Sequence, residues 1–505
     1  MDELTKLRNE IDELDQIIME KLNTRFCIIE KIASYKRLHQ LPIDDKKREM
    51  IILSKTINYP FSYSLSNVYQ QIIHESKLLQ TKQTFLIGKS LPYSYSKEIH
   101  HELGNPYYSL YETNDFESFI KNNYFYGLNI TNPFKTLALN YAHTTSDIVK
   151  ATGVANLLVR RHDLIHAENV DYDAFIEMLG LYNIQVQNMK AIIVGNGATS
   201  KTVALALHHL GIKRIVKLVR TIRSENEYLL ENYRQFKDFD IIINTTSYGV
   251  KPYYVDKFLF SLAHFTDLKA VIDVNYNPYR TPLVQEALRH KDSYKNEVKI
   301  LSGLSMLVAG AKKSEVIWMT KDESTFKSTK DLTKHFLEEK LNLVLIGMPY
   351  SGKTTIGKKI ALIFKRPFID TDEILRNRQQ SIEHFRHQSN FINAFREAEA
   401  NVIKEIISNE GYVIATGGGA VEREENLTYL SQSGIIIYLN IPLETLYKRF
   451  DDTRLLIDSK ETLNTYYQKR HPLYLKYADI IINDESIIIE ELMVKVHEYF
   501  NNQWS

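Results

Sequence analysis

A glycine-containing segment, GMPYSGKT at 347–354, has the spacing G-x-x-x-x-G-K-[ST] of a phosphate-binding loop. It lies between an apolar stretch that reads as a strand and a helix-like run, TIGKKIALIF. The glycines would let backbone N–H groups surround phosphates at a helix N-terminus, where Lys353 meets the β/γ charge and Thr354 ligates Mg²⁺. This pattern predicts phosphoryl transfer from ATP. The residues expected at the nucleotide are Gly347, Gly352, Lys353, Thr354 and Thr355.

A second glycine loop, GNGATS at 195–200, follows the apolar run AIIV and precedes a helical pattern. This order is typical of a dinucleotide-binding loop, although Ser200 stands where the third glycine of G-x-G-x-x-G would be. The next predicted strand ends in arginine-rich sequence, where an NAD enzyme would carry Asp or Glu. We therefore expect NADP(H), with an ordinary basic strand end as the alternative. The predicted contacts are Gly195, Gly197, Ala198, Thr199, Arg220 and Thr221.

The first 40 residues predict one long helix, because apolar residues recur at spacings of three and four from Leu4 to Ile32. About 36 helical residues span ~54 Å, whereas a compact domain of about 80 residues has a radius of gyration of only ~12 Å. The rest of such a domain could not cover the rod, so we expect a helical dimer. Arg25 and Lys36 lie within about 20° of one face, while Arg8 lies about 100° away from Arg25 and could serve a partner subunit.

Two shorter helical patterns follow, at about 44–57 and 64–80. Asp45, Arg48 and Glu49 line one face of the first, and Ser76 and Gln80 are four residues apart on the second. A solvated charged face is the alternative reading of these polar residues.

The length of 505 residues favours three to four domains. From Thr84 onward, short apolar runs alternate with helical stretches, and the alternation restarts near Leu341, which is typical of α/β domains with mostly parallel sheets. We expect a multidomain protein: an all-α dimer domain at 1–82, an α/β domain at 84–320 and a second α/β domain at 341–505. A polar linker is predicted at 321–340, although its second half could be a helix with a solvated face.

Lys+Arg 63 against Asp+Glu 62 leaves a formal net charge of +1, which argues against nucleic-acid and anionic-membrane partners. No apolar run approaches the ~18 residues that a bilayer span requires, and the first residues lack the layout of a signal peptide. The single cysteine, Cys27, is expected in an apolar helical core. These features predict a soluble cytoplasmic protein.

Several motifs follow the phosphate loop in order: FIDTD (368–372), FREAE (395–399), TGGG (416–419), TRLL (453–456) and RHPLY (470–474). Together they resemble shikimate kinase from Leu341 to the C-terminus. The resemblance implies that Asp372, Arg396 and Arg470 hold shikimate, with the two arginines on its carboxylate and Asp372 at the attacking 3-hydroxyl. It also implies roles for Asp370 at Mg²⁺, for the backbone of Gly417, Gly418 and Gly419 beside the ring, and for Arg454 at the transferring phosphate.

The middle segment, from about Thr84 to Trp318, resembles shikimate dehydrogenase in its motifs GLNITNPFK (127–135), TGVAN (152–156), NVD (169–171), NTTSYG (244–249) and DVNYNP (273–278). The resemblance implies a substrate-binding part at 84–180 and about 280–320, and a Rossmann part at about 185–278. Lys135 and Asp171 would form the proton-transfer pair. The residues implied around 3-dehydroshikimate are Ser94, Ser96, Thr131, Asn156 and Tyr276. Gly310 stands where a substrate-binding glutamine is usual, so a related polyol such as quinate and a weakly catalytic scaffold remain alternatives.

The polar set of the first 82 residues resembles the all-helical class of chorismate mutase. The resemblance implies that Arg25, and Arg8 of the other subunit, bind the two carboxylates of chorismate. Lys36 and Gln80 would hydrogen-bond the ether oxygen, and Asp45, Arg48, Glu49 and Ser76 would surround the hydroxyl side. We therefore expect a trifunctional homodimer of aromatic amino-acid biosynthesis with chorismate mutase, NADP-dependent shikimate dehydrogenase and ATP-dependent shikimate kinase activities. The alternative is that the helical domain senses chorismate or prephenate without converting it.

Overall fold

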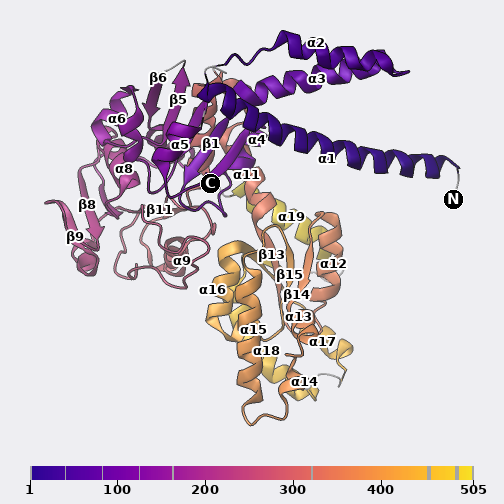
Figure 1. The fold of residues 1–505 in the computed structure, drawn as a ribbon. Coiled ribbons are helices and arrows are strands. Elements are labelled where there is room, and N and C mark those ends of the chain that lie inside the picture. Colours follow the sequence, from indigo (N-terminus) through magenta and orange to yellow (C-terminus); the bar gives the residue numbers. More distant parts are fainter. Residues whose placement is uncertain are drawn as a thin grey trace. The chain divides into compact units, whose positions relative to one another are not determined.

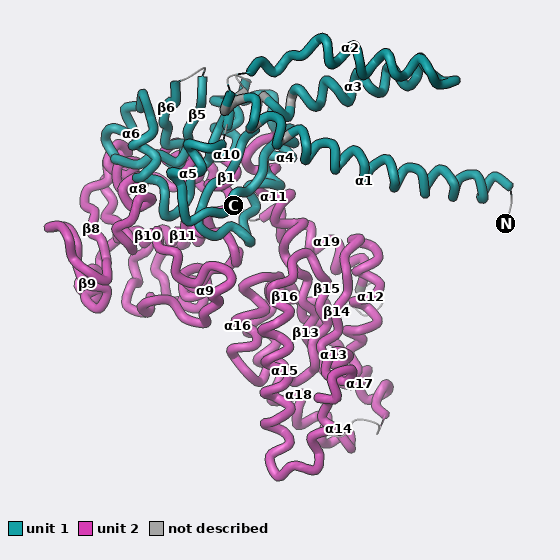
Figure 2. The backbone as a smooth tube through the Cα atoms, in the orientation of Figure 1, with its two compact units in different colours: residues 1–171, 310–326 teal, residues 172–309, 327–505 magenta. Residues whose placement is uncertain are grey.

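The fold is known from a computed structural model that describes residues 3–39, 41–81, 83–123, 125–161, 164–319, 322–451, 457–483 and 488–502. The chain divides into two compact units (Figure 2). Unit 1 comprises 1–171 and 310–326, and unit 2 comprises 172–309 and 327–505. Among the described residues, no helix combines the length and the apolar character that crossing a membrane requires.

Unit 1 begins with a helical segment, coloured indigo in Figure 1. Its first helix, α1, runs over Glu3–Leu38 and has the 36 residues that the sequence predicts. The elements that follow are α2 (Lys46–Ser54), the 3₁₀ helix η1 (Lys55–Asn58) and α3 (Ser62–Thr81). Asp45 caps α2 by accepting a hydrogen bond from the backbone N–H of Arg48.

The N-terminal half of α1 leaves its apolar residues exposed. Leu4, Leu7, Ile11, Leu14 and Ile18 are each more than half exposed although they recur at helical core spacing. The expectation that Cys27 lies in a core is wrong, because this residue of α1 is exposed. Within this chain, burial in the helical segment is concentrated near Ala33 of α1 and Ile73 of α3.

A six-stranded sheet completes unit 1, in the order β2-β1-β3-β5-β6-β4. Strands β1, β2 and β3 are parallel, but β5 pairs antiparallel with β3 and with β6. The sheet is therefore mixed, whereas the sequence predicts mostly parallel sheets, because β5 and β6 form an antiparallel hairpin. The strands are β1 (Thr84–Gly88), β2 (Tyr108–Glu112), β3 (Gly127–Ile130), β4 (Thr144–Thr145), β5 (Leu157–Arg161) and β6 (Leu164–Glu168). The helices are α4 (Ser96–Glu102), α5 (Phe116–Asn122), η2 (Leu137–Tyr141), α6 (Asp147–Thr152) and the part of α10 (Leu304–Met319) from Gly310 onward.

Unit 2 contains a second six-stranded sheet, in the order β12-β11-β10-β7-β8-β9, with every pair parallel. Its strands are β7 (Lys190–Val194), β8 (Arg214–Val219), β9 (Glu227–Leu229), β10 (Ile241–Asn244), β11 (Ala270–Asp273) and β12 (Lys299–Leu301). Its helices are α7 (Val170–Leu181), α8 (Ala198–His209), η3 (Leu230–Phe236), α9 (Pro282–Arg289) and η4 (Lys291–Ser293), together with the start of α10.

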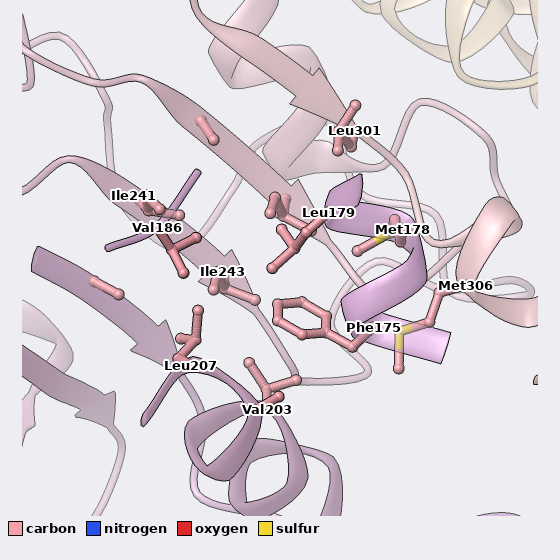
Figure 3. Packing of buried hydrophobic residues seen from close by; sticks show 14 of the residues in the cluster. Phe175, Met178, Leu179, Val186, Val203, Leu207, Ile241, Ile243, Leu301 and Met306 are labelled. Carbon is pink, nitrogen blue, oxygen red and sulfur yellow. The ribbon is translucent and has the colours of Figure 1, made fainter. Parts of the chain in front are cut away.

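Both faces of this sheet are buried, as parallel strands require. Figure 3 shows Phe175 and Met178 of α7 packed with Ile243 of β10 and Val203 of α8. The other face packs on a cluster rich in phenylalanine that includes Phe236. These two layers hold the carboxyl ends of β7 and β10 in place.

The third sheet has the order β14-β15-β13-β16-β17 and is also parallel throughout. Its strands are β13 (Asn342–Ile346), β14 (Phe368–Asp370), β15 (Val413–Ala415), β16 (Gly434–Leu439) and β17 (Ile480–Ile482). The helices around it are α12 (Lys353–Ile363), α13 (Thr371–Asn377), α14 (Ile382–Phe385), α15 (Phe391–Ile406), η6 (Ala420–Glu422), α16 (Glu424–Ser433), α17 (Leu443–Arg449), α18 (Lys460–Tyr477) and α19 (Ile488–Asn501).

The segment for which a linker was predicted is partly helical. A short 3₁₀ turn, η5 (Glu323–Thr325), is followed by α11 (Thr329–Lys340), which Ser328 caps. Leu332, Phe336 and Leu337 of α11 are buried, so this helix has an apolar face as well as a polar one. The second half of the segment thus adopts the helical alternative that the sequence left open.

Within unit 2, polar contacts join the loops after β10 and β11 to segments beside the third sheet. Arg280 donates to both carboxylate oxygens of Asp479, at 3.0 and 2.6 Å, and to the hydroxyl of Tyr499. Glu410 accepts from Lys251 and from Asn277. These side chains are largely buried, so removing one member of a pair would leave an uncompensated buried charge and destabilise the fold.

Candidate active sites

The phosphate loop after β13 is shaped by glycine. Gly352 has φ +86° and starts α12, and no side chain caps that helix N-terminus. Lys353 is buried, and its ammonium donates to the carbonyl oxygens of Gly347 and Met348, both at 2.9 Å. Uncapped N–H groups at a helix start next to a lysine suit a nucleotide's phosphates, so the residues present fit the predicted ATP site.

Asp370 connects this loop to the next element. It accepts a hydrogen bond from the Thr354 hydroxyl at 2.6 Å, and its other oxygen caps α13 by accepting from the backbone N–H groups of Asp372 and Glu373. Thr354 and Asp370 thus present two neighbouring oxygens, the ligand type that Mg²⁺ prefers. Thr355 is exposed in the first turn of α12. The cap on α13 also fixes where Asp372 stands relative to the phosphate loop.

The glycine triplet lies against the predicted substrate-binding side chains. A Cβ atom on Gly417 would stand 2.7 Å from Asp372 Oδ1, and one on Gly419 would overlap the Arg396 guanidinium. A Cβ on Gly418 would meet Pro349, beside the phosphate loop. The absence of side chains here is what allows Asp372 and Arg396 to approach the backbone.

Arg396 and Arg470 converge although they come from α15 and α18. Their side chains are 10% and 3% exposed, and both donate to Oε1 of Glu422, at 3.5 Å from Arg396 Nη2 and 2.7 Å from Arg470 Nε. Arg396 also donates to the fully buried Glu399 at 2.9 Å. The structure therefore brings the two predicted arginines together. Arg454, the remaining predicted residue, lies outside the described residues.

Glu399 and Glu422 were not singled out from the sequence, and their pKa values move in opposite directions. Burial raises the pKa of Glu399, and Arg396 only partly offsets it. Burial would also raise the pKa of Glu422, but the charge of Arg470 and the hydrogen bond from Lys469 outweigh it and lower the pKa. The spacing of Arg396 and Glu399, three residues apart on one helix, was the available sequence signal for the first pair.

In unit 1, Lys135 and Asp171 form the predicted pair. The lysine ammonium lies 2.5 Å from Asp171 Oδ2, and the two side chains are 14% and 20% exposed. Asp171 stands in the first turn of α7, which Asn156 anchors by accepting from the backbone N–H of Val170 at 2.8 Å. Asn156 is buried, so in this structure its side chain orders the helix that carries Asp171.

The other predicted substrate residues of unit 1 lie at the ends of elements. Ser94 donates to Ser96 across 3.1 Å at the start of α4, and Ser96 is buried. Thr131 follows β3, and its backbone N–H donates a hydrogen bond to the carbonyl oxygen of Ile87. Each of these positions is a strand or helix terminus, where α/β proteins present ligand-binding side chains.

In unit 2, the dinucleotide loop leads into α8. Gly195 has φ +104°, and Gly197 precedes α8 without a side-chain cap, so the first N–H groups of this helix suit a pyrophosphate. Ala198 and Thr199 open the helix, while Ser200 is fully buried where the third glycine would be. These residues fit the predicted dinucleotide.

Arg220 and Thr221 are exposed directly after β8. A carboxylate missed in the sequence, Glu227, lies nearby and accepts from Asn196 of the glycine loop and from the backbone N–H of Arg223. Burial would raise its pKa, but the hydrogen bonds from Arg223 and Asn196 outweigh that and lower it.

Tyr276 stands in the loop after β11, and buried Asp273 organises that loop. Asp273 accepts hydrogen bonds from Asn244, Thr281 and Asn275. Burial nevertheless raises the pKa of Asp273 to about 6. Tyr276 itself is half-buried.

In the helical segment, Arg25, Ser76 and Gln80 gather where α1 meets α3. Arg25 donates to the Ser76 hydroxyl at 2.5 Å, and Gln80, which is buried, donates to the Ser76 carbonyl at 3.0 Å. Lys36, on the same face of α1, donates to the Ile43 carbonyl at 2.8 Å. Burial lowers the pKa of Arg25.

The remaining predicted residues of this segment are less enclosed. Glu49 pairs with Lys77 at 2.8 Å, and Lys77, missed in the sequence, also pairs with Asp44. Arg48 is exposed beside the capping residue Asp45. Arg8 is exposed on α1, about 25 Å along the helix axis from Arg25 at 1.5 Å per residue. One chain thus gathers part of the predicted set and leaves Arg8 apart.

Within the part of the chain that the structure describes, no group of three or more His, Cys, Asp or Glu side chains is arranged to hold a metal ion. The Thr354 and Asp370 pair is of a different kind, because it could complete a metal's coordination only together with a nucleotide's phosphates.

Comparisons with known proteins address each segment separately. Residues 349–500 match the family model of shikimate kinase, and residues 7–81 match that of chorismate mutase type II. A shikimate dehydrogenase (NADP(+)) of Clostridium botulinum (strain Loch Maree / Type A3) is 30% identical over 253 residues, which cover 46% of this chain and 95% of that protein. A shikimate kinase of Actinobacillus pleuropneumoniae serotype 5b (strain L20) is 32% identical over 171 residues, covering 33% of this chain and 99% of that protein.

Among solved structures, a chorismate mutase/shikimate 5-dehydrogenase fusion protein from Clostridium acetobutylicum has a TM-score of 0.44 and 25% identity, covering 51% of this chain and 96% of that one.

Four features define a multidomain enzyme: a phosphate loop beside an arginine pair and a Rossmann-type sheet in unit 2, and a lysine and aspartate pair and a three-helix polar cluster in unit 1. The chain belongs to the shikimate dehydrogenase family in its middle part and to the shikimate kinase family in its C-terminal part, and its N-terminal part is a chorismate mutase domain of type II. It is a trifunctional enzyme of the shikimate pathway.

Proposed function

We propose that the chain rearranges chorismate to prephenate, reduces 3-dehydroshikimate to shikimate with NADPH, and phosphorylates shikimate with ATP and Mg²⁺. The observation that carries the proposal furthest is the double contact of Asp370, which joins the phosphate loop to the helix that carries Asp372. A donor site and an acceptor site held by one carboxylate suit phosphoryl transfer, which depends on positioning and charge neutralisation.

When bound, NADPH supplies a hydride and ATP with Mg²⁺ supplies the phosphoryl group. In the kinase, Arg396 and Arg470 would bind the shikimate carboxylate, and Asp372 would accept the proton of the 3-hydroxyl as its oxygen attacks. Gly417, Gly418 and Gly419 would lie under the ring. Lys353 would stabilise the negative charge on the phosphates, and Arg454 is proposed to do so from the other side.

In the dehydrogenase, Lys135 would donate a proton to the C3 oxygen of 3-dehydroshikimate as the hydride reaches C3. Asp171, 2.5 Å away, would hold the ammonium in place and favour its charged form. Ser94, Ser96, Thr131 and Tyr276 would bind the substrate's oxygens, while Asn156 would act mainly through α7. Arg220 and Thr221 would contact the 2′-phosphate of NADP.

In the mutase, Arg25 would bind one carboxylate of chorismate while Lys36 and Gln80 stabilise negative charge on the ether oxygen as its bond to carbon breaks and the new carbon–carbon bond forms. Arg8 is too far along α1 to join them from the same chain. We therefore propose a homodimer, supported by the exposed apolar residues of α1, in which each α1 covers its partner and supplies Arg8. A cytoplasmic location is also proposed, supported by the single cysteine, which can form no disulfide within the chain.

The test gives the purified chain 3-dehydroshikimate, NADPH, ATP and Mg²⁺, with chorismate in a parallel reaction, and follows products by mass spectrometry. We expect shikimate, shikimate 3-phosphate and prephenate. Lys135→Ala should abolish the formation of shikimate without affecting that of prephenate. Lys36→Ala should abolish the formation of prephenate without affecting that of shikimate. Binding of chorismate without any turnover in the unmodified chain would replace the mutase by a sensor.

A further inference from the structure

The two arginines proposed to bind the substrate's carboxylate are already paired with a carboxylate of the chain. Oε1 of Glu422 accepts from Arg396 Nη2 at 3.5 Å and from Arg470 at 2.7 Å (Nε) and 2.6 Å (Nη2). Arg470 therefore presents one full edge of its guanidinium to Glu422. That edge is one of those with which a guanidinium can bind a carboxylate through two parallel hydrogen bonds.

The position of Glu422 follows from the glycine triplet. Glu422 ends η6, the short 3₁₀ turn that starts directly after Gly419. Gly419 lies against Arg396, so a side chain three residues later is carried to the same pair of arginines. Glu422 is thus built into the wall of the proposed substrate site, and its side chain is 17% exposed.

A second partner holds the other oxygen of Glu422 nearer to solvent. Lys469, whose side chain is 59% exposed, donates to Oε2 at 2.6 Å. Glu422 therefore has a cationic partner that remains available if its bonds to the arginines break. Glu399, the other carboxylate that accepts from Arg396, is fully buried and cannot turn toward solvent in this way.

We propose that Glu422 is an internal competitor for the substrate's carboxylate: it occupies the arginine pair in the free enzyme, and shikimate must displace it toward Lys469 to bind. This inference rests on the proposed kinase function. Two carboxylates directed at the same guanidinium edge repel each other, so displacement reduces the substrate's affinity without changing the phosphoryl-transfer step. Glu422 is in this sense an affinity-determining residue.

The competitor is charged throughout the neutral range. The charge of Arg470 and the hydrogen bond from Lys469 outweigh burial and lower the pKa of Glu422. The same contacts that hold Glu422 at the arginines thus favour its charged form, which is the form that competes with a carboxylate.

The test is steady-state kinetics of the full chain with the Glu422→Gln substitution, which keeps the shape of the side chain and removes its charge. We expect the KM for shikimate to fall by about tenfold, equivalent to losing one competing charge-assisted contact, with kcat and the KM for ATP within about twofold. Glu422→Ala should shift the KM in the same direction. Glu424→Gln is the matched control. That glutamate lies two residues further along the chain and is exposed, and its Oε1 atom is 4.0 Å from Lys476 Nζ.

A second ligand separates competition from a general loosening of the site. Shikimate methyl ester, which lacks the carboxylate charge, should have the same KM in the kinase reaction of the unmodified chain and of the Glu422→Gln variant, whereas the KM for shikimate should be lower in the variant. An unchanged or raised KM for shikimate in the variant would overturn the inference, since Glu422 would then only orient the arginines.

The failure of the proposed kinase function has a different signature. If Arg470→Ala raises the KM for shikimate while Glu422→Gln does not lower it, the arginines bind the substrate as proposed, but the proposed competition by Glu422 is wrong. If the unmodified chain does not phosphorylate shikimate, or if Arg470→Ala leaves its KM unchanged, both proposals are wrong.

Discussion

The kinase and the mutase are both expected to bind a small carboxylate with arginines, yet they place those arginines differently. In the kinase, Arg396 and Arg470 are 74 positions apart in the sequence, come from different helices and lie buried against the same glutamate. In the mutase, Arg25 is half-buried and meets a serine hydroxyl, and Arg8 is exposed and distant on the same helix. One site is enclosed by a single chain, and the other is open.

The difference follows from how each fold brings residues together. A parallel sheet aligns the carboxyl ends of its strands, so loops distant in sequence converge at one edge and are covered on both faces. Three helices without a sheet present residues only along their own surfaces, and a 36-residue helix extends beyond what its neighbours can cover. An open half-site with an exposed apolar surface is what a second copy of the chain could complete.

The largest expected effect is confined to the enclosed site. Lys353→Met removes the ammonium that the Gly347 and Met348 carbonyls hold in the phosphate loop, and we expect kinase kcat to fall by about 10²–10³. Dehydrogenase and mutase rates should stay unchanged, which coupled assays of the same preparation can measure. Lys359→Met, an exposed lysine on the same helix, is the control. A comparable loss in the mutase would mean that the three sites are not independent.

Active-site complementation tests the open site directly. Arg8→Ala and Arg25→Ala should each reduce chorismate turnover by about 10², because each removes a charge-assisted contact to a carboxylate. If sites are shared between subunits, mixing the two variants after subunit exchange restores about a quarter of the sites, since half of the dimers are mixed and each of those has one intact site. No recovery would mean that Arg8 does not complete the partner subunit's site.

The same mixing experiment on the kinase should restore no shikimate phosphorylation. Arg396→Ala and Arg470→Ala remove two arginines that meet at one glutamate of one chain, so no exchange of subunits can rebuild an intact pair. Recovery of shikimate phosphorylation would contradict the enclosed site.

Much of this contrast was predictable from the sequence. The long helix with its apolar spacing, the strands that end just before glycine motifs, and the Lys135–Asp171 pair were all expected and are present. These features are encoded locally, by periodicity or by motifs whose residues have fixed spacing.

Features that depend on tertiary pairing were not predicted. The hairpin of β5 and β6 has no turn signature that separates it from a helical stretch. Cys27 was expected in a core because its neighbours on the helix are apolar, but within one chain it is exposed. Lys77 and Glu422 became visible only when their partners, on other elements, were placed. A charged residue whose partner is distant in sequence carries no local pattern.

Two glycine substitutions sharpen the contrast between a crowded backbone and an open one. Gly419→Ala places a Cβ atom inside the Arg396 guanidinium, so we expect the KM for shikimate to rise about tenfold and the kinase to lose about 1–3 kcal/mol of stability. Gly180→Ala, on the exposed side of α7 with open space around it, should be neutral or slightly stabilising. Kinetics and calorimetry of both variants check this. Equal effects would show that crowding at Gly419 is unimportant.

The contribution of the buried carboxylate Glu399 to the stability of the kinase should change with pH in the opposite direction from that of the exposed carboxylate Asp44. Burial raises the pKa of Glu399, so the folded state binds more protons than the unfolded chain between the usual and the raised pKa, and stability falls as pH rises through that interval. Glu399→Gln should flatten this decline. Calorimetry can follow the kinase transition, identified by its upward shift when ADP is added. A decline that persists in the variant would assign it to another group.

The smallest effect is expected at Asp44 of the helical domain. Its hydrogen bond and charge interaction with Lys77 lower its pKa, so the stabilising contribution of the pair is present above the usual pKa of an aspartate and is lost as pH falls through the lowered value. Because Asp44 is exposed, about 1 M salt should remove most of the difference between the unmodified chain and Asp44→Asn, whereas the pH dependence of Glu399 should survive it. The transition to follow is the one that depends on protein concentration, as unfolding of a dimer must. A salt-insensitive Asp44 would mean that a second copy of the chain covers α2 as well as α1, and the helical domain would then be as enclosed as the kinase, with two chains in place of one.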